Sequence, residues 1–223
     1  MKADDEPCKL YRFRSLGDRR QFARLRDTLK KHRLYCPRPE ELNDPFDCVV
    51  KMGDGDARRA EDIQARVSMR AGILSFTEHN SNILMWSHYA GSHRGMCLQF
   101  DMRVWNPNNR NRPCHLDKVA YCMNRPLVTE PNSNQTDTAA LKAMAFTKHA
   151  DWRYEDEWRM ICSFKSCRPR FLKFPKSALT GIIFGLRMAD NDRRAVKKII
   201  RDAEYPNLTL YEAREDHNRF RHC

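Results

Sequence analysis

The chain has 223 residues, and its 41 lysines and arginines against 29 aspartates and glutamates give a formal net charge of +12 at pH 7. This length suits one complete hydrophobic core, so we predict a single domain over residues 1–223. The positive charge is spread along the chain and favours an anionic partner, whether nucleic acid, a nucleotide or an acidic surface, without selecting among them.

Membrane and disulfide-stabilised classes do not fit the sequence. No run approaches the roughly 20 apolar residues of a membrane helix, and the start, MKADDEPCKL, lacks the apolar region of a signal peptide. We therefore expect a cytoplasmic protein without a membrane partner. Nine cysteines without a CxxC pair indicate free thiols in a reducing compartment. Zinc is the alternative, but its clustered ligand spacing is missing, so we predict no metal site. The candidate zinc ligands would be Cys114, His115, Cys162 and Cys167.

The first half of the chain predicts strands and helices in mixed order. Alternating side chains predict a strand over 8–16, and apolar residues at helical spacing on a basic surface predict a helix over 17–34. The proline-rich segment 35–48 is expected to be an ordered loop. The next predicted elements are a polar helix over 57–71, a strand over 72–80, a short helix over 82–90 and a strand over 95–101.

The second half continues without the regular spacing of βαβ units. Two Asn- and Pro-rich segments, 105–113 and 124–138, are predicted surface excursions on either side of a strand over 118–123. The absence of βαβ spacing predicts an α+β fold with a twisted mixed sheet, flanking helices and a central cleft. The remaining predicted elements are a helix over 140–150, strands over 152–164, 170–174 and 179–186, a basic helix over 189–203 and a strand over 208–213.

The segment WRYEDEWRM, Trp152–Met160, places three acids between tryptophans and arginines. On a strand, alternate residues share a face, so Glu155, Glu157 and Arg159 would point one way and line the wall of a site. The opposite face would carry Tyr154, Trp158, Met160, Cys162 and Phe164. The alternative is that the acids form ordinary salt bridges with neighbouring arginines such as Arg153.

Two further features combine with these acids. An arginine, Arg12 or Arg14, ends the first predicted strand, and the strand over 72–80 carries the hydroxyls of Ser75 and Thr77 on one face. Together with the two glutamates, and in this order, they resemble the arginine, serine-threonine-serine, glutamate-x-glutamate signature of mono-ADP-ribosyltransferases. The middle motif of this chain lacks the third hydroxyl.

The resemblance implies an ADP-ribosyltransferase-like fold and NAD as the substrate. Loss of nicotinamide passes through an oxocarbenium-like sugar cation, which a carboxylate stabilises as in glycoside hydrolysis. By this resemblance Glu157 is the catalytic carboxylate, and Glu155 is its partner in orienting a nucleophile. Arg12 or Arg14 would neutralise the pyrophosphate. The hydroxyls that would position the ribose and support the glutamate are those of Ser75 and Thr77.

A closer resemblance extends over most of the chain. In order, the chain contains LYRFRS, LNDPFDC, ILMWSHYAGSHRGMCLQFD and WRYEDEWRMI. These are similar to the signature segments of the bacterial family called domain of unknown function 2971. Such families tend to occur in defence and mobile-element settings. The positions that this resemblance singles out are Tyr11, Arg12, Arg14, Asn43, Asp44, Trp86, His88, Tyr89, His93, Gly95, Trp152, Glu155, Glu157 and Arg159.

Two of these motifs have alternative interpretations. Trp86 and Tyr89 either pack as core aromatics of a short helix or form an aromatic floor on which a nicotinamide or a base stacks, so both are cofactor-binding candidates. The LNDPFD motif is either a turn capped by Asn43 and Asp44, which we favour, or a loop that brings acids to the pocket.

The sequence thus predicts an NAD-dependent ADP-ribosyltransferase-like enzyme, of a defence or toxin type, that modifies nucleic acid or protein. In such an enzyme Arg12 or Arg14, Ser75 and Glu157 would converge on one cleft. The alternative is a nucleic-acid-binding or nuclease-like defence module without NAD chemistry, in which the glutamates are structural; no compact acidic metal cluster supports its nuclease version. A regulatory interaction domain is the third interpretation.

Overall fold

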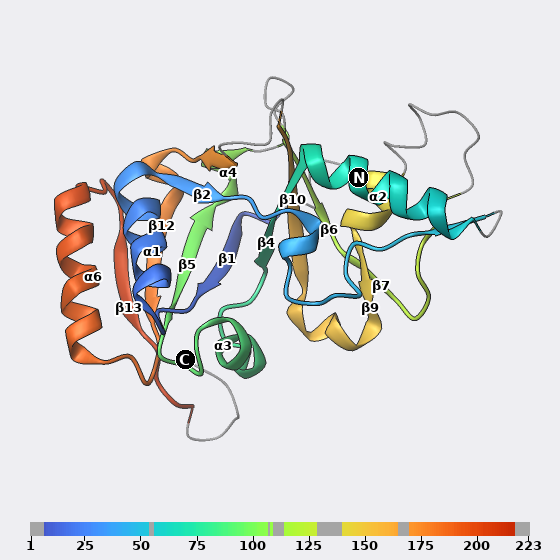
Figure 1. Cartoon of the computed structure of the whole chain (residues 1–223). Helices are drawn as coiled ribbons and strands as arrows, with labels where there is room; N and C mark the ends of the chain where they lie inside the picture. The colour runs from blue at the N-terminus through green and yellow to red at the C-terminus, as the bar shows by residue number, and fades with distance from the viewer. Residues whose placement is uncertain are drawn as a thin grey trace. The chain divides into compact units, whose positions relative to one another are not determined.

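Two compact units make up the chain in the computed structural model (Figure 1). Unit 1 consists of Met1–Leu34, Phe76–Asn106 and Leu172–Cys223, and unit 2 of Tyr35–Ser75 and Pro107–Phe171. Both units combine strands with helices, which confirms the predicted α+β class, whereas the prediction of one domain stays a prediction. The residues that the structure describes are 7–53, 56–106, 108, 114–128, 140–164 and 170–216.

The sheet of unit 1 mixes antiparallel and parallel pairs. Its strands in spatial order are β13 (Thr209–Glu212), β12 (Leu179–Phe184), β5 (Met96–Asp101) and β1 (Lys9–Arg14). β1 and β12 pair antiparallel with β5, whereas β13 pairs parallel with β12. A parallel pair requires a crossover connection, which α6 (Asp190–Ala203) supplies between β12 and β13. On β1, Tyr11 also pairs with Thr77, the last residue of β4 (Ala71–Thr77).

The basic helix predicted over 17–34 is α1 (Arg19–Lys31). It begins after Asp18, whose side chain accepts a hydrogen bond from the Gln21 N–H at 2.7 Å, and it ends at His32 in the left-handed conformation. α1 packs beside α6 in unit 1 (Figure 1). The other helices in the described part of this unit are α3 (Ile83–Tyr89), α4 (Met102–Trp105) and the 3-10 helix η4 (Lys176–Ala178).

A tight loop after α3 uses three successive left-handed residues. Gly91, Ser92 and His93 have φ angles of 56°, 54° and 68°. This conformation is unfavourable for serine and histidine, so it needs support from the surroundings. The backbone N–H groups of Ser92 and His93 donate to carbonyls of α3 at 3.1 Å each, which supplies that support. The loop therefore returns the chain tightly into β5.

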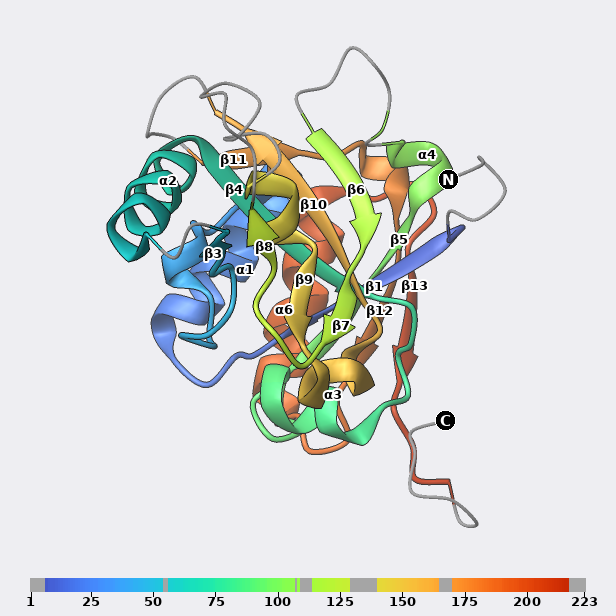
Figure 2. The same ribbon diagram turned by 90° about the vertical axis from the view of Figure 1, so that its right-hand side faces the viewer.

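Unit 2 is built around strands from distant parts of the sequence. Residues 71–75 of β4 belong to it, followed in spatial order by β10 (Glu157–Ser163) and β6 (Cys114–Lys118). β10 and β6 pair antiparallel. Two parallel pairs of short strands complete the unit, and Figure 2 shows one of them, β7 and β9, side by side. The short strands are β7 (Ala120–Cys122), β9 (Thr147–His149), β3 (Lys51–Met52) and β8 (Leu127–Val128).

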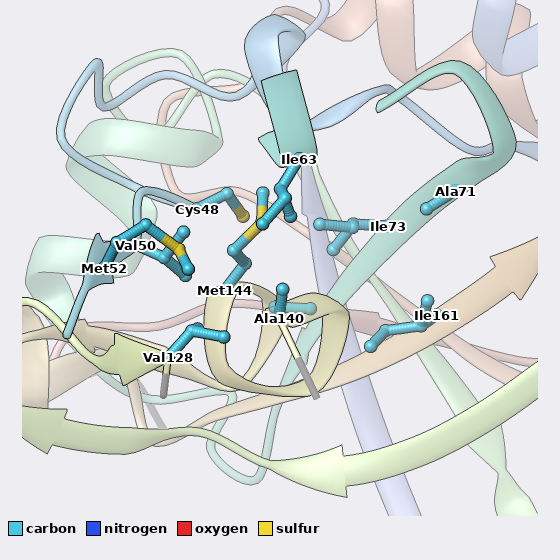
Figure 3. Close-up of a cluster of buried hydrophobic side chains, with 11 residues drawn as sticks. Cys48, Val50, Met52, Ile63, Ala71, Ile73, Val128, Ala140, Met144 and Ile161 are labelled. Carbon is cyan, nitrogen blue, oxygen red and sulfur yellow. The ribbon is translucent and has the colours of Figure 1, made fainter. Parts of the chain in front are cut away.

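The apolar core of unit 2 joins a loop that leads into β3, two helices and the strands β4, β8 and β10 (Figure 3). α2 (Ala57–Arg70) contributes Ile63, and the helical segment at 140–145 contributes Met144; the two side chains point toward one another in Figure 3. Their burial, together with that of their neighbours, fixes the loop at 48–52 against both helices. The other buried members are Cys48, Val50, Met52, Ala71, Ile73, Val128, Ala140, Ala145 and Ile161.

Several boundaries differ from the sequence prediction. The segment predicted as a strand from residue 152 begins as the 3-10 helix η3 (Ala150–Glu155), and β10 starts only at Glu157. Between them Asp156 is left-handed with a φ of 42°, which ends η3 with a turn. The helix predicted over 140–150 gives way to β9 at Thr147, and the sequence pattern did not indicate β6. Three further elements are β2 (Arg33–Tyr35), η2 (Pro39–Glu41) and β11 (Phe171–Lys173). Of the excursions predicted over 105–113 and 124–138, residues 107, 109–113 and 129–138 lie outside the described residues.

Gly95, which follows the left-handed loop, leaves no room for a side chain. A Cβ there would stand 2.0 Å from the Arg14 carbonyl oxygen and 2.9 Å from that of Ala90. We expect Gly95→Ala to lower the free energy of unfolding by about 2–3 kcal/mol, because backbone rather than a flexible side chain has to move. Urea unfolding measures the change. Gly17→Ala is the control, since its Cβ would meet its nearest neighbour at 3.5 Å; equal losses in the two variants would contradict the prediction.

Candidate functional site

A fully buried arginine, Arg159, is the centre of an ionic network in unit 2. It follows Glu157 by two residues on β10, so both side chains lie on one face of the strand. Arg159 Nε donates to Glu157 Oε1 at 2.8 Å, and Nη2 donates to Oε2 at 3.0 Å. Its Nη1 and Nη2 also donate to the two carboxylate oxygens of Asp47, at 2.9 and 2.5 Å. One guanidinium therefore holds two carboxylates, each through a pair of hydrogen bonds.

A second buried cation, Lys148 on β9, completes the network. Its Nζ lies 2.6 Å from Glu155 Oε2, 3.2 Å from Glu157 Oε2 and 3.8 Å from Asp47 Oδ2. Burial lowers the pKa of Lys148, but the charges of Glu157 and Glu155 outweigh that effect, so its pKa is raised and the ammonium stays protonated. Lys148 also stands 4.8 Å from the centroid of the Trp152 ring, in a cation–π contact.

The network consists of five buried charged groups, so each of them needs a charged and hydrogen-bonded partner. Three carboxylates and two cations leave a formal surplus of one negative charge when all five groups are ionised, and all five residues are buried. Buried charges are tolerated only when they are paired and hydrogen-bonded. The left-handed Asp156 serves this requirement, because the turn there lets Glu155 and Glu157 both reach Lys148. The backbone N–H of Glu157 donates to the Tyr121 hydroxyl at 2.8 Å.

Glu157 is also hydrogen-bonded to Ser75, which lies on β4 and is partly exposed. The Ser75 hydroxyl donates, because the carboxylate can only accept. Burial raises the pKa of Glu157, but the charges of Arg159 and Lys148 and the hydrogen bonds from Arg159 and Ser75 more than reverse this, and the pKa falls to about 2. Glu157 is therefore a fixed negative charge at neutral pH.

A cavity of about 520 Å³ opens in unit 2 beside this network. Its lining comes from three segments, at 44–49, 122–126 and 147–152. Lys148 belongs to both features, since it lines the cavity and its Nζ contacts the carboxylates. Trp152 adds an aromatic ring to the lining. A ligand in the cavity would thus be separated from Glu157 by the Lys148 side chain.

The arginines and the threonine predicted for the site lie in unit 1. Arg12 places its guanidinium carbon 5.7 Å from the centroid of the Phe76 ring. Burial, followed by the charges of Arg12 and Arg24, lowers the pKa of Arg14 to about 9. Thr77 is buried, and its hydroxyl accepts a hydrogen bond from the His79 N–H at 3.3 Å. Of the predicted signature, the structure thus brings Ser75 to Glu157, and the convergence of the whole set stays a prediction.

The two aromatic candidates on α3 have different surroundings. Trp86 is fully buried, its indole N–H donates to the Asn80 carbonyl at 2.6 Å, and its ring meets Phe13 edge-on at 5.1 Å. It also stacks on His93 at 6.5 Å. Tyr89 is partly exposed. The role of the pair as a stacking floor for a cofactor stays a prediction.

Sequence reasoning missed two members of the network. Asp47 lies in the LNDPFDC segment, whose pattern predicts a turn. That turn is present, because Asp44 Oδ1 accepts a hydrogen bond from the Phe46 N–H at 2.9 Å. Lys148 is one of many cations in a basic chain, and no local pattern distinguishes it. The sequence does contain one signal for Asp47. Arg159 lies on a predicted strand, and a buried arginine there needs an acidic partner from elsewhere in the chain.

Two negative findings concern the part of the chain that the structure describes. No helix there has the length and apolar character to cross a bilayer. No group of three or more His, Cys, Asp or Glu among the same residues is arranged to hold a metal ion.

Comparisons with known proteins add one family and one structure. A family model described as "Protein of unknown function (DUF2971)" matches residues 85–160, which confirms the predicted resemblance over that range. Curated proteins gave no match. Among solved structures, Thermus sp. 2.9 DarT in complex with ADP-ribosylated ssDNA is similar with a TM-score of 0.40 and 11% sequence identity, over 92% of this chain and 94% of that chain. A likeness at that TM-score carries no argument about chemistry, which has to come from the side chains.

The lowered pKa of Glu157 predicts a defined sensitivity to acid. The ordinary value is 4.5 and the folded value about 2, so the ionised carboxylate contributes stability that is complete above pH 4.5 and is lost as the pH falls toward 2. We expect the free energy of unfolding in urea to fall over that interval. Glu157→Gln should be less stable at pH 7 and have a flatter pH dependence, whereas Glu61→Gln, an exposed glutamate on α2, should keep the parent slope. A parent-like slope in Glu157→Gln would contradict this assignment.

Proposed function

We propose that this chain is an NAD-dependent ADP-ribosyltransferase-like enzyme in which Glu157 is the catalytic carboxylate. The observation that carries the proposal is the hydrogen bond from Ser75 to Glu157. It joins the hydroxyl motif and the glutamate motif of the transferase signature, which are far apart in sequence. The low pKa of Glu157 adds support, because a carboxylate that stabilises a sugar cation has to be ionised at neutral pH.

The proposed reaction replaces nicotinamide by an acceptor. The bond between the ribose anomeric carbon and the nicotinamide nitrogen breaks, and its electron pair leaves with neutral nicotinamide. The carboxylate stabilises the resulting oxocarbenium-like cation, as a carboxylate does in glycoside hydrolysis. A nucleophile on the acceptor then bonds to the anomeric carbon and releases one proton. NAD and the protonated acceptor thus give ADP-ribosylated acceptor, nicotinamide and a proton.

Ser75 and the members of the ionic network have distinct parts in this proposal. Ser75 is a positioning residue, because it acts on substrate only through the Glu157 carboxylate. Arg159 keeps that carboxylate ionised and immobile. Lys148 lies between the cavity and Glu157, so access of a sugar requires its side chain to shift, which a flexible four-carbon chain permits. Glu155, already bonded to Lys148, is the proposed partner in orienting the nucleophile.

Within unit 1, Arg14 is a better candidate than Arg12 for the pyrophosphate ligand. Arg12 is engaged with the Phe76 ring. Arg14 has no carboxylate partner among the residues that the structure describes, and its lowered pKa reflects burial and the nearby charges of Arg12 and Arg24. A guanidinium surrounded by like charges gains from a bound anion. The acceptor class, nucleic acid or protein, and the defence or toxin role belong to the same proposal.

Nicotinamide release tests the enzyme assignment. We expect Glu157→Gln to slow release from NAD on the order of a hundredfold or more, because it removes the charge that stabilises the cation. Ser75→Ala alone should slow nicotinamide release by a smaller factor. Added to Glu157→Gln, it should cause no further loss, since Ser75 acts through Glu157. Chromatographic assay of nicotinamide with single-stranded DNA, RNA or protein acceptors provides the measurement.

The exposed Ser163, at the end of β10, supplies the matched control as Ser163→Ala. Thermal unfolding of every variant establishes that it is folded under the assay conditions. An inactive parent with all acceptors, or a folded Glu157→Gln variant as active as the parent, would rule the enzyme out.

A second candidate function, nucleic-acid binding without NAD chemistry, is favoured by two observations. Both oxygens of Glu157 are already bonded to Arg159 or Lys148, as in a purely structural ion network. In addition, α1 and α6 pack together in unit 1 and present a row of exposed cations, as a phosphate backbone would require. The exposed cations are Arg19, Arg20, Arg24, Arg26, Lys30, Lys31, Arg194, Lys197, Lys198 and Arg201.

The salt dependence of binding tests this basic face. If α1 and α6 contact phosphates, log affinity for nucleic acid should fall linearly with log salt, with a slope of roughly 0.7–0.9 per phosphate contacted. Arg20→Glu with Lys198→Glu should reduce that slope. Arg58→Glu with Arg70→Glu makes the same charge change on exposed positions of α2. This control should keep a steeper salt dependence than the Arg20→Glu, Lys198→Glu variant. If the two double variants behave alike, net charge rather than this face determines binding.

A further inference from the structure

The cavity of unit 2 has the size and lining of a ligand site. Its volume of about 520 Å³ lies within the range that small-molecule pockets occupy, roughly 300–1,000 Å³. All of its lining belongs to unit 2. The lining includes Asp44 and Trp152, which both stand in the motifs that carry the family resemblance. The proposed chemistry at Glu157 uses this cavity as the approach past Lys148 and gives no role to Asp44 or Trp152.

Two large apolar side chains on the lining are unusually exposed. Phe46 and Met123 are each 70% exposed, and both line the cavity together with the Trp152 ring. Large apolar groups exposed together around a hollow mark binding sites more often than structural positions. An aromatic ring and a thioether both favour a flat, polarisable ring as the ligand.

An acidic group on the same lining has an oxygen that is open to a hydrogen-bond donor. Asp44 is only 9% exposed, and its Oδ1 accepts from the Phe46 N–H at 2.9 Å. Among the residues that the structure describes, its second oxygen, Oδ2, has neither a hydrogen bond nor an ion pair. Oδ2 is not one of the fully enclosed polar atoms, so a donor inside the cavity can reach it. A ligand with an N–H group there would gain a charge-assisted hydrogen bond to Asp44.

Charge decides between a cationic and a neutral donor. The lining carries two cations, Arg125 and Lys148, and two acids, Asp44 and Asp151, so it is formally neutral, whereas the whole chain carries a formal charge of +12. A guanidinium or ammonium ligand is repelled by the charge of the chain as it approaches. A neutral ring attached to a polyanionic strand meets attraction instead, and exposed Arg125 is placed to contact its phosphates.

We infer that this cavity binds an unpaired nucleobase bearing an exocyclic amino group, with its ring stacked on Trp152 and its amino group donating to Asp44. Cytosine is the simplest such base, and carboxylates accept from its N4 amino group in known protein–DNA contacts. The inference deepens the proposed function and rests on it for one point only, that the bound strand is the acceptor. Binding of the base itself requires no NAD.

A matched pair of strands tests the inference. Fluorescence anisotropy compares labelled ten-nucleotide strands of oligo(dC), oligo(dU) and an abasic backbone, without NAD. Cytosine and uracil differ in the amino group that Asp44 would accept from, so oligo(dC) should bind about tenfold more tightly than oligo(dU). Both should bind more tightly than the abasic strand, since stacking on Trp152 is open to either base.

Two variants separate the roles of the cavity side chains. Asp44→Asn keeps an oxygen for the Phe46 N–H and turns the other position into a donor, so the preference should shift from oligo(dC) to oligo(dU), whose O4 accepts. Trp152→Ala should weaken both base-containing strands by about tenfold and spare the abasic strand. Met69→Ala, an exposed methionine elsewhere in unit 2, is the control and should change neither.

Some results would overturn the inference. Equal affinity for all three strands would do so, as would an unchanged preference in a folded Asp44→Asn variant. Tight binding of N-methylguanidine that Asp44→Asn abolishes, without discrimination among strands, would show that the cavity takes a guanidinium instead. If the strands are discriminated as expected but no nicotinamide is released from NAD, the transferase proposal is rejected and the base site stands. The two proposals can therefore fail separately.

Discussion

The guanidinium of Arg159 is the constraint on which the rest of unit 2 depends. It bonds Glu157 on its own strand, Asp47 from a loop 112 residues away and the carbonyl oxygen of Ala145. A charge buried to this degree cannot lose one partner without leaving another unpaired. The loop at 44–49, the helical segment at 140–145 and β10 are therefore held in one arrangement. Because the loop at 44–49 lines the cavity, the same ion pairs fix one wall of it.

Lys148 connects that constraint with the proposed activity. Its ammonium satisfies Glu155 and Glu157, while its side chain faces the cavity and the Trp152 ring. The network has one more carboxylate than cation, so it is better matched to an additional positive charge than to an additional negative one. A sugar cation formed beside it would find that charge already in place. The structural and catalytic interpretations of the glutamates are therefore compatible, because the pairing that stabilises the fold also keeps the carboxylate ionised.

Local patterns predicted most of the elements, and long-range pairings account for what they missed. Helix α1 follows from the spacing of Leu25 and Leu29, and β4 and β5 follow from apolar runs next to turn residues. The start of β10 was predicted five residues too early, since periodicity carries no information on the left-handed turn at Asp156. Ser75 and the glutamates were predicted as one set through a family resemblance. Lys148 and Asp47 could not be predicted in that way, because their importance arises only when distant segments fold together.

The division of each unit into separate chain segments has a consequence for synthesis on the ribosome. Unit 2 contains residues 35–75 and 107–171, so it is complete while β12, α6 and β13 of unit 1 are still to be made. The first strand of unit 1, β1, waits for its partner β5 until residues 96–101 are made, and α1 waits for α6 until residues 190–203 are made. Chains grow at about 5–20 residues per second, so β1 and α1 spend seconds without their final neighbours. The strong basic charge of α1 keeps this early segment soluble during that delay, which gives its arginines a use before any ligand is bound.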